Sequence, residues 1–158
     1  MKLLILFFGI TFFSIFLGAQ ITEAVLLIPY WKSLPPTAFY VYYDQYGHTI
    51  GQFYTVLTII AALLPVLLAL YCSLIKSTAF KFALISSFFA ALFIASFYVY
   101  FKAANQLFFE AALSPNLLKE ELITWGYWHW GRIGIECISL IFFVLSAIKL
   151  MYDRKHLI

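Results

Sequence analysis

Residues 49–74 read TIGQFYTVLTIIAALLPVLLALYCSL and contain no charged side chain. A helix that crosses a lipid bilayer needs about 20 consecutive, mostly apolar residues, and this stretch supplies them. Pro65 lies inside the stretch, but membrane-spanning helices tolerate an internal proline, often with a kink. The stretch therefore predicts a membrane-spanning helix.

Three other stretches of the chain have the same apolar character and a comparable length. They run from about residue 3 to 28, from 78 to 104 and from 128 to 150. Together the four stretches predict an all-α fold, namely an integral membrane four-helix bundle that forms a single domain over residues 1–158.

The composition excludes whole classes of protein. Of the 158 residues, 65% are hydrophobic and only 11% are charged. In a soluble domain about 25% are charged, so a soluble enzyme, a disordered protein and a disulfide scaffold are excluded and membrane lipid is the expected surrounding. The net charge is +3 and the basic residues are scattered, so we expect no nucleic-acid partner. Cys72 and Cys137 lie in apolar runs and are predicted to be buried and unpaired.

The first apolar stretch shares features with a signal peptide. Lys2 precedes an apolar run, and Leu17-Gly18-Ala19 would serve as a cleavage site. The apolar run resumes at residues 24–31, which would be an unusual start for a mature protein. We therefore expect the stretch to be retained as the first helix.

The distribution of Lys and Arg predicts the orientation in the membrane, because basic residues concentrate on the cytoplasmic side. With the N-terminus inside, the cytoplasmic side holds Lys2, Lys76, Lys81, Lys149, Arg154 and Lys155. The opposite side holds Lys32, Lys102, Lys119 and Arg132. This bias predicts a plasma or inner membrane location with both termini in the cytoplasm.

The two outer loops are expected over residues 31–47, which include Pro35-Pro36, and residues 107–127. In the second loop, Ser114 and Pro115 suit the N-cap and first position of a helix, so we predict a short helix lying on the outer interface. All four tryptophans, Trp31, Trp125, Trp128 and Trp130, fall on this side. They form either an aromatic belt at the headgroups or an aromatic lid over a site for a flat, apolar ligand.

Several polar side chains lie within or at the ends of the apolar stretches, where ionisable groups are costly and are functional candidates by default. Because the helices alternate in direction, one outer layer collects Glu23, His48, Gln52, Asn105, His129 and Arg132. Gln20 lies one turn before Glu23, and Tyr98 lies seven residues before Asn105. In the last stretch, Trp125, His129, Arg132 and Glu136 form one stripe at helical spacing. This layout predicts a polar pocket under an aromatic cap, with Trp125, Trp128, Gln52 and Tyr98 as substrate-binding residues.

Each of these residues also has a structural interpretation. Arg132 can pair with Glu136 one turn away or with Glu23 across the bundle. Asn105 and Gln52 can form hydrogen bonds between helices, and His48 can simply face water. Small residues such as Gly9 permit close helix contact, either within the chain or in a homo-oligomer.

Three chemistries fit the polar layer. Glu23, His48 and His129 could form a two-histidine, one-carboxylate site for iron or another divalent metal, or the two histidines could be the axial ligands of a haem. Alternatively, the site needs no cofactor: His129 or His48 acts as a general base, and Arg132 and Asn105 stabilise a phenolate or enolate oxyanion. Glu23 then orients the histidine or carries its proton. Electron-rich hydroxyarenes can react with oxygen directly once they are deprotonated.

The chain contains Glu23-Ala24-Val25 with Pro29, then Leu34-Pro35, His48, Asn105 and the block from Trp125 to Arg132, which reads WGYWHWGR. In these residues it resembles the anthrone-oxygenase-like family of small four-helix membrane proteins. The resemblance implies an oxygenase that converts anthrones into anthraquinones without a classical cofactor, with His129, Arg132 and Asn105 in the site.

The sequence is consistent with three functional hypotheses. The first is a membrane oxygenase or oxidoreductase for a lipophilic hydroxyaromatic or quinone-like molecule. The second is a non-catalytic module that binds or transports such a molecule, and the third is a structural accessory subunit whose polar residues only lock the helices together.

Overall fold

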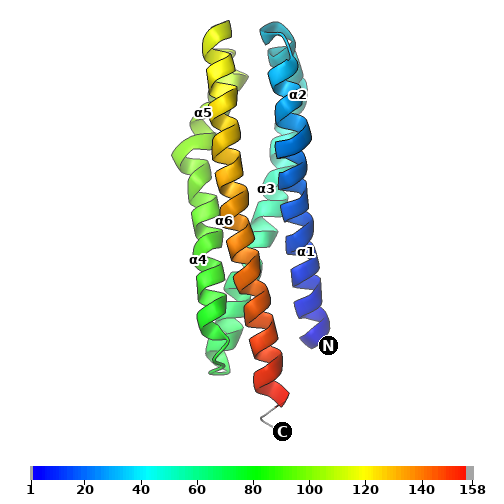
Figure 1. Ribbon diagram of the computed structural model, residues 1–158, viewed down its shortest axis with the longest axis vertical. Helices are drawn as coiled ribbons and strands as arrows, with labels where there is room; N and C mark the ends of the chain where they lie inside the picture. The colour runs from blue at the N-terminus through cyan, green and yellow to red at the C-terminus, as the bar shows by residue number, and fades with distance from the viewer. Residues whose placement is uncertain (1, 156–158) are drawn as a thin grey trace.

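The computed structural model describes residues 2–155, which form four antiparallel helical rods (Figure 1). Two of the rods contain a π-helical turn, labelled η. The first rod joins α1 (Lys2–Thr22), η1 (Glu23–Leu27) and α2 (Ile28–Ser33). The second is α3 (Pro36–Leu74), the third joins α4 (Phe80–Ser96), η2 (Phe97–Phe101) and α5 (Lys102–Phe109), and the fourth is α6 (Pro115–Lys155).

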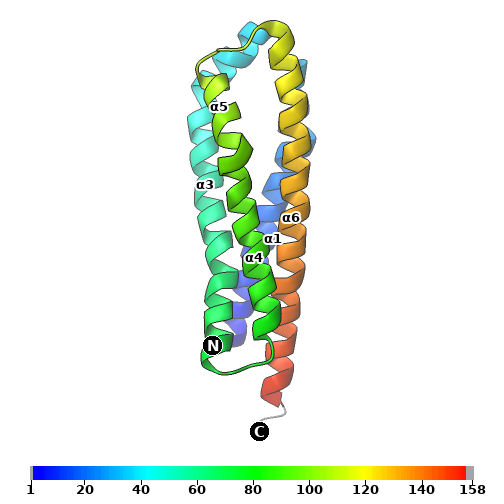
Figure 2. The same ribbon diagram turned by 90° about the vertical axis from the view of Figure 1, so that its left-hand side faces the viewer.

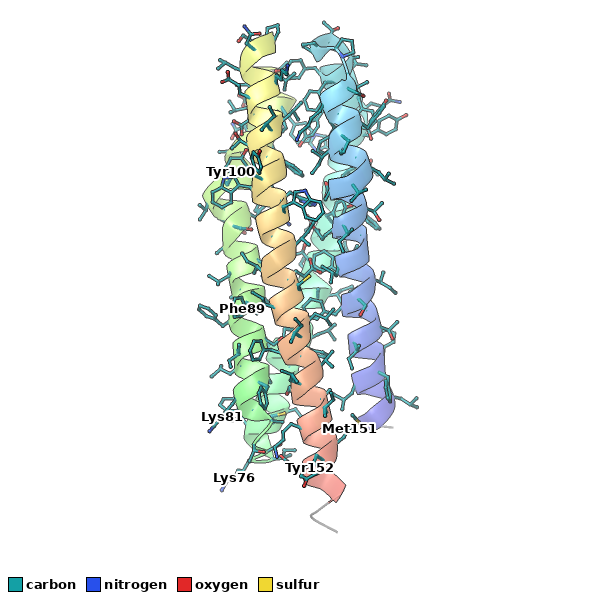
Figure 3. The ribbon with its side chains drawn as sticks, in the orientation of Figure 1. Lys76, Lys81, Phe89, Tyr100, Met151 and Tyr152 are labelled. Atoms are coloured by element: carbon teal, nitrogen blue, oxygen red, sulfur yellow. The ribbon has the colours of Figure 1, made fainter. Side chains whose placement is uncertain are left out.

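The helix α6 packs against both α4 and α1, and α3 packs against α4 (Figures 1 and 2). The helix α1 begins and α6 finishes at the same end of the bundle, where the α3–α4 turn also lies (Figure 1). Figure 3 shows Lys76 and Lys81 at this end, together with Tyr152 of α6. The turns between α2 and α3 and between α5 and α6 lie at the opposite end, which we call the outer end.

The predicted all-α four-helix fold is confirmed. Within residues 2–155, four helices are long and apolar enough to cross a membrane: Leu6–Ser33, Pro36–Leu74, Phe80–Phe109 and Pro115–Asp153. Large apolar side chains point outward, as Leu74 does with 83% of its surface exposed, whereas the buried side chains include glutamine, glutamate, histidine and several serines. An apolar exterior around polar groups is the arrangement expected of a multi-pass membrane protein.

The first predicted outer loop is wrong, because α3 begins at Pro36 and leaves only a short turn after Ser33. Proline suits the first turn of a helix, where its missing N–H would have no partner. Phe39 and Tyr43 then fall on one helical face, four residues apart, and both are buried. The aromatic segment therefore adds to the outer core as helix.

The second outer loop is also shorter than predicted. A helix does begin at Pro115, as expected, and Leu118 N–H donates to the Ser114 carbonyl at 2.8 Å. It is not a separate interfacial helix, however, because α6 continues without a break to Lys155. Leu118, Leu122 and Trp125 are buried on the face that continues into the spanning segment, so the bundle extends the helix beyond the predicted membrane boundary.

Serine side chains join α4 to α6 near the middle of the bundle. Ser86 Oγ donates to the Ser139 carbonyl at 2.8 Å, and Ser139 Oγ donates to the Ser86 carbonyl at the same distance. On the other side of α6, a Cβ added to Gly9 of α1 would lie 3.0 Å from the Phe143 ring. Small residues thus permit the close helix contacts that stabilise membrane bundles.

The ends of α5 and α3 adopt a left-handed conformation at a residue other than glycine. At the end of α5, Ala111 has φ of 47° and its N–H donates to the Phe108 carbonyl, while Ala112 N–H donates to Leu107. These two hydrogen bonds form a Schellman motif, which glycine favours because it has no Cβ. Lys76 occupies the same position after α3, with φ of 53°.

Replacing Ala111 by glycine is therefore expected to stabilise the protein by about 1 kcal/mol, since a left-handed residue with a Cβ costs roughly 1–2 kcal/mol. The measurement is reversible unfolding in mixed detergent micelles. Ala112→Gly is the matched control and should give no gain, because Ala111 and Lys76 are the non-glycine residues of positive φ in the described chain. Equal effects of the two substitutions would contradict the assignment.

Candidate functional site

The polar layer of the bundle is centred on Glu23, which is the first residue of the π-helical turn η1. The Glu23 side chain is 5% exposed, and the preceding Gln20 is fully buried. A π-turn changes the rotation of the helix, and such turns occur often at functional sites. Gln20, in the last turns of α1, and Glu23, at the start of η1, both contact the fourth rod.

His129 of α6 is the partner of both residues. Its Nε2 lies 2.9 Å from the backbone carbonyl oxygen of Gln20 and 3.8 Å from Oε2 of Glu23. A carbonyl can only accept a hydrogen bond, so Nε2 carries a proton and donates it to Gln20. In the neutral imidazole the lone pair then lies on Nδ1, which is buried and has no hydrogen-bond partner. His129 therefore has a basic nitrogen available inside the bundle.

Trp125 covers the imidazole one turn above it. The two rings stack with 5.1 Å between their centroids and 12° between their planes. The indole Nε1 donates to Oδ1 of Asn105 at 3.0 Å, which fixes the indole from the α5 side. Trp31 packs edge-on against Trp125 at 5.4 Å, and both tryptophans are buried.

Arg132 lies one turn below His129, between two phenyl rings. Its guanidinium carbon is 4.3 Å from the centroid of Phe93 and 4.4 Å from that of Phe101. Cation–π contacts of this kind are stronger where water is excluded. The guanidinium interacts electrostatically with two carboxylates, Glu23 and Glu136. One cation therefore interacts with two acidic groups.

Arg132 does not form the predicted ion pairs with Glu23 and Glu136 by direct contact. No ion pair within 4.0 Å joins Arg132 to either carboxylate among the described residues, and the Arg132 Nε hydrogen has no hydrogen-bond partner. Around Glu23, the Tyr54 hydroxyl donates to the Ala19 carbonyl at 3.0 Å and lies near the carboxylate. The polar layer thus keeps several unused donors and acceptors.

The structure brings together five of the residues predicted for the site. His129, Glu23 and Arg132 form one cluster, which we call the acid–base cluster, and Trp125 and Asn105 cover it. In the four-residue stripe predicted on the last helix, Trp125, His129 and Glu136 are buried and Arg132 is half-buried, so the stripe lies on the inward face of α6.

Four other predicted residues lie on the outside of the bundle. His48 is exposed and stacks on Phe109 at 4.3 Å, and Gln52 is exposed on the same helix. Tyr98 is 68% exposed. Trp128 is exposed and stacks on Tyr100, which Figure 3 shows beside α6. The structure therefore does not place these side chains in the acid–base cluster.

The position of His48 also bears on the two metal hypotheses. In residues 2–155, no group of three His, Cys, Asp or Glu side chains is placed to hold a metal ion. The set Glu23, His48 and His129 is consequently not assembled. Because His48 is exposed and His129 is buried, the two histidines are not placed to ligate one haem.

The two interpretations of the tryptophans apply to different residues. Trp128 and Trp130 are exposed at the outer half of α6, as a belt at the headgroups requires. Trp31 and Trp125 are buried, with 2% and 4% exposure; Trp125 stacks on His129, and Trp31 packs against Trp125. These two form an aromatic cover over the acid–base cluster.

The sequence did not single out Phe93 and Phe101, which hold the guanidinium, or Tyr54, which lies beside Glu23. Phenylalanine is common throughout the chain, so nothing in the pattern distinguishes these two rings. Gln20 could be recognised in the sequence, because it is a polar residue one helical turn before Glu23 in an apolar run.

The fold and the cluster define a four-helix membrane-type bundle with a buried acid–base pair next to an arginine. Comparison with family models, with curated proteins and with solved structures finds no match to this chain.

Proposed function

We propose that the acid–base cluster is the active site of a membrane-embedded oxygenase or oxidoreductase that acts on a lipophilic hydroxyaromatic or quinone-like molecule. The observation that carries the proposal is the buried Glu23–His129 pair, 3.8 Å apart, with Nδ1 of His129 free and Arg132 one turn away. Ionisable groups inside a membrane bundle are costly and mark functional sites by default.

In this proposal His129 Nδ1 removes the proton from the hydroxyl group of the substrate. The imidazolium formed is stabilised by the Glu23 carboxylate, and Arg132 stabilises the phenolate oxygen. The oxidant is dioxygen, which reacts with the electron-rich ring. For a hydroxyarene whose tautomer carries a ring methylene, one oxygen atom becomes the carbonyl oxygen, and the other leaves as water with the two methylene hydrogens.

We also propose that both ends of the chain face the cytoplasm. The start of α1 and the end of α6 lie at the same end of the bundle as Lys76 and Lys81 (Figures 1 and 3). The acid–base cluster then lies in the half of the bundle that faces away from the cytoplasm. The excess of basic residues at the cytoplasmic end supports this orientation.

One observation favours the alternative of a binding module or a structural accessory subunit. His129 is fully buried, and its Nε2 already has a partner in the Gln20 carbonyl. A substrate can reach Nδ1 only if neighbouring side chains move. A histidine that serves packing alone would be expected to have this closed environment.

Oxygen consumption separates these functions. The purified protein is reconstituted into lipid vesicles and supplied with anthrone as a hydroxyarene probe, and dissolved oxygen is followed with an electrode. We expect uptake in the wild type and a loss of at least about 100-fold in His129→Gln, the usual scale of a general base. Trp130→Phe, at an exposed position, is the control and should keep the wild-type rate. Equal rates in His129→Gln and the wild type would contradict the proposal.

A further inference from the structure

A second buried carboxylate lies deeper in the bundle than the acid–base cluster. Glu136 of α6 is 1% exposed, and neither of its carboxylate oxygens has a hydrogen-bond partner. It follows His129 by seven residues, which places it about 10 Å further along the helix. A buried carboxylate without any hydrogen bond is costly, so its environment requires an explanation.

The Glu136 side chain borders a small cavity between α1, α3, α4 and α6. The cavity is lined by Phe13, Phe16, Thr58, Ala61, Ala62, Ala90, Phe93, Glu136 and Ser139. Most of these side chains are apolar, but the hydroxyls of Thr58 and Ser139 are polar. The cavity, about 10 Å³, is just large enough for one water molecule, which can bond to Glu136, to the Thr58 hydroxyl and to the lone pairs of the Ser139 oxygen.

Few charged or titratable groups lie close enough to Glu136 to interact with its carboxylate. On its own helix these are the Arg132 guanidinium and the neighbouring thiol of Cys137. The cavity-lining residues of α1, α3 and α4 are not titratable. Arg132 is therefore the one cation that acts on this carboxylate within residues 2–155.

The same cation also acts on Glu23. With His129 neutral, two ionised glutamates and one arginine would leave an uncompensated negative charge in the mostly apolar interior of the bundle. One glutamate must therefore carry a proton. Glu23 has His129 and the Tyr54 hydroxyl beside it, whereas Glu136 has no hydrogen bond. The negative charge is therefore more stable on Glu23 than on Glu136.

We propose that Glu136 and the adjoining cavity form a proton-binding site in the interior of the bundle. The neutral carboxylic acid holds the proton and donates it in a hydrogen bond to a water molecule in the cavity. The site lies away from the outer end and has no part in the chemistry proposed for His129. The inference therefore stands independently of the proposed oxygenase activity.

Infrared spectroscopy of the protein in lipid nanodiscs at neutral pH tests the site. A protonated carboxylic acid has a carbonyl stretch that an ionised carboxylate lacks, and this band shifts in D₂O. We expect the band in the wild type, a shift of its frequency in Glu136→Asp and its loss in Glu136→Gln. The band should keep its frequency in the matched variant Glu23→Asp, which preserves the negative charge beside Arg132. The absence of the band from the wild type, or a shift in Glu23→Asp with none in Glu136→Asp, would overturn the proposal.

A chemical probe keeps the test decisive if Glu136→Gln does not fold. A hydrophobic carbodiimide reacts with protonated carboxyl groups inside membranes, and the adduct is located in the wild-type protein by peptide mass spectrometry. We expect the adduct on Glu136. Modification of Glu23 with none of Glu136 would overturn the proposal.

Discussion

Replacing Trp125 by alanine is expected to lower the free energy of unfolding by about 3–5 kcal/mol, the usual cost of truncating a buried aromatic side chain. The indole is 4% exposed and packs against the rings of Trp31, Phe101 and His129. Alanine leaves a cavity among three aromatic rings that are fixed by their own helices. The Asn105 side chain also loses its hydrogen-bond donor.

Reversible denaturation in mixed detergent micelles measures this loss, and two variants serve as controls. Trp125→Phe keeps most of the ring but loses the hydrogen bond to Asn105, so about 1 kcal/mol is expected from that bond. Trp130→Ala removes a tryptophan that is 50% exposed and should change stability far less. Similar losses in Trp125→Ala and Trp130→Ala would show that Trp125 is not part of the core.

Replacing Arg132 by methionine is expected to destabilise the protein by about 3–5 kcal/mol, as when one partner of a buried ionic group is removed. Methionine keeps much of the aliphatic stem that lies between Phe93 and Phe101. The loss therefore reports on the charge, since Glu23 is left buried without its cation. Lys102→Met, at an exposed position, is the control and should change stability by less than about 0.5 kcal/mol.

A double-mutant cycle identifies the partner of this charge. If Glu23 is the carboxylate that Arg132 compensates, Glu23→Gln should remove a large part of the cost of Arg132→Met, with a coupling of about 1–3 kcal/mol. Glu136→Gln should couple more weakly, because a neutral Glu136 gains little from the guanidinium. Additive losses for Glu23 and Arg132 would mean that the two side chains are energetically independent.

The sequence could predict the number of helices because four long apolar runs determine it. It could not predict where the helices end on the outer side, because Phe39, Tyr43, Leu118 and Trp125 gain burial only when they pack against one another. The sequence prediction placed Phe39 and Tyr43 in a loop, and Leu118 and Trp125 in a separate short helix at the outer interface. The packing of the aromatic side chains instead extends α3 and α6 as helix.

The site was partly predictable for a similar reason. The stripe on α6 depends on helical spacing alone, and His129 and Glu136 are indeed buried. Bringing residues from other helices into one layer requires their rotation as well as their depth. On α3, the buried Tyr43 and Gly47 determine the inward face, so the adjacent His48 points outward. The π-turn at Glu23 likewise depends on packing and leaves no clear pattern in the sequence.

The proposed activity requires that His129 provide a free basic nitrogen in a buried acid–base cluster that binds a hydroxyarene. Nitrogen NMR of histidine-labelled protein in nanodiscs tests it most directly, with the His129 signals assigned by their absence from His129→Gln. We predict a neutral ring protonated at Nε2, and a change in the Nδ1 signal when a hydroxyarene is added. A ring protonated at Nδ1, or an Nδ1 signal unaffected by saturating ligand, would contradict the account.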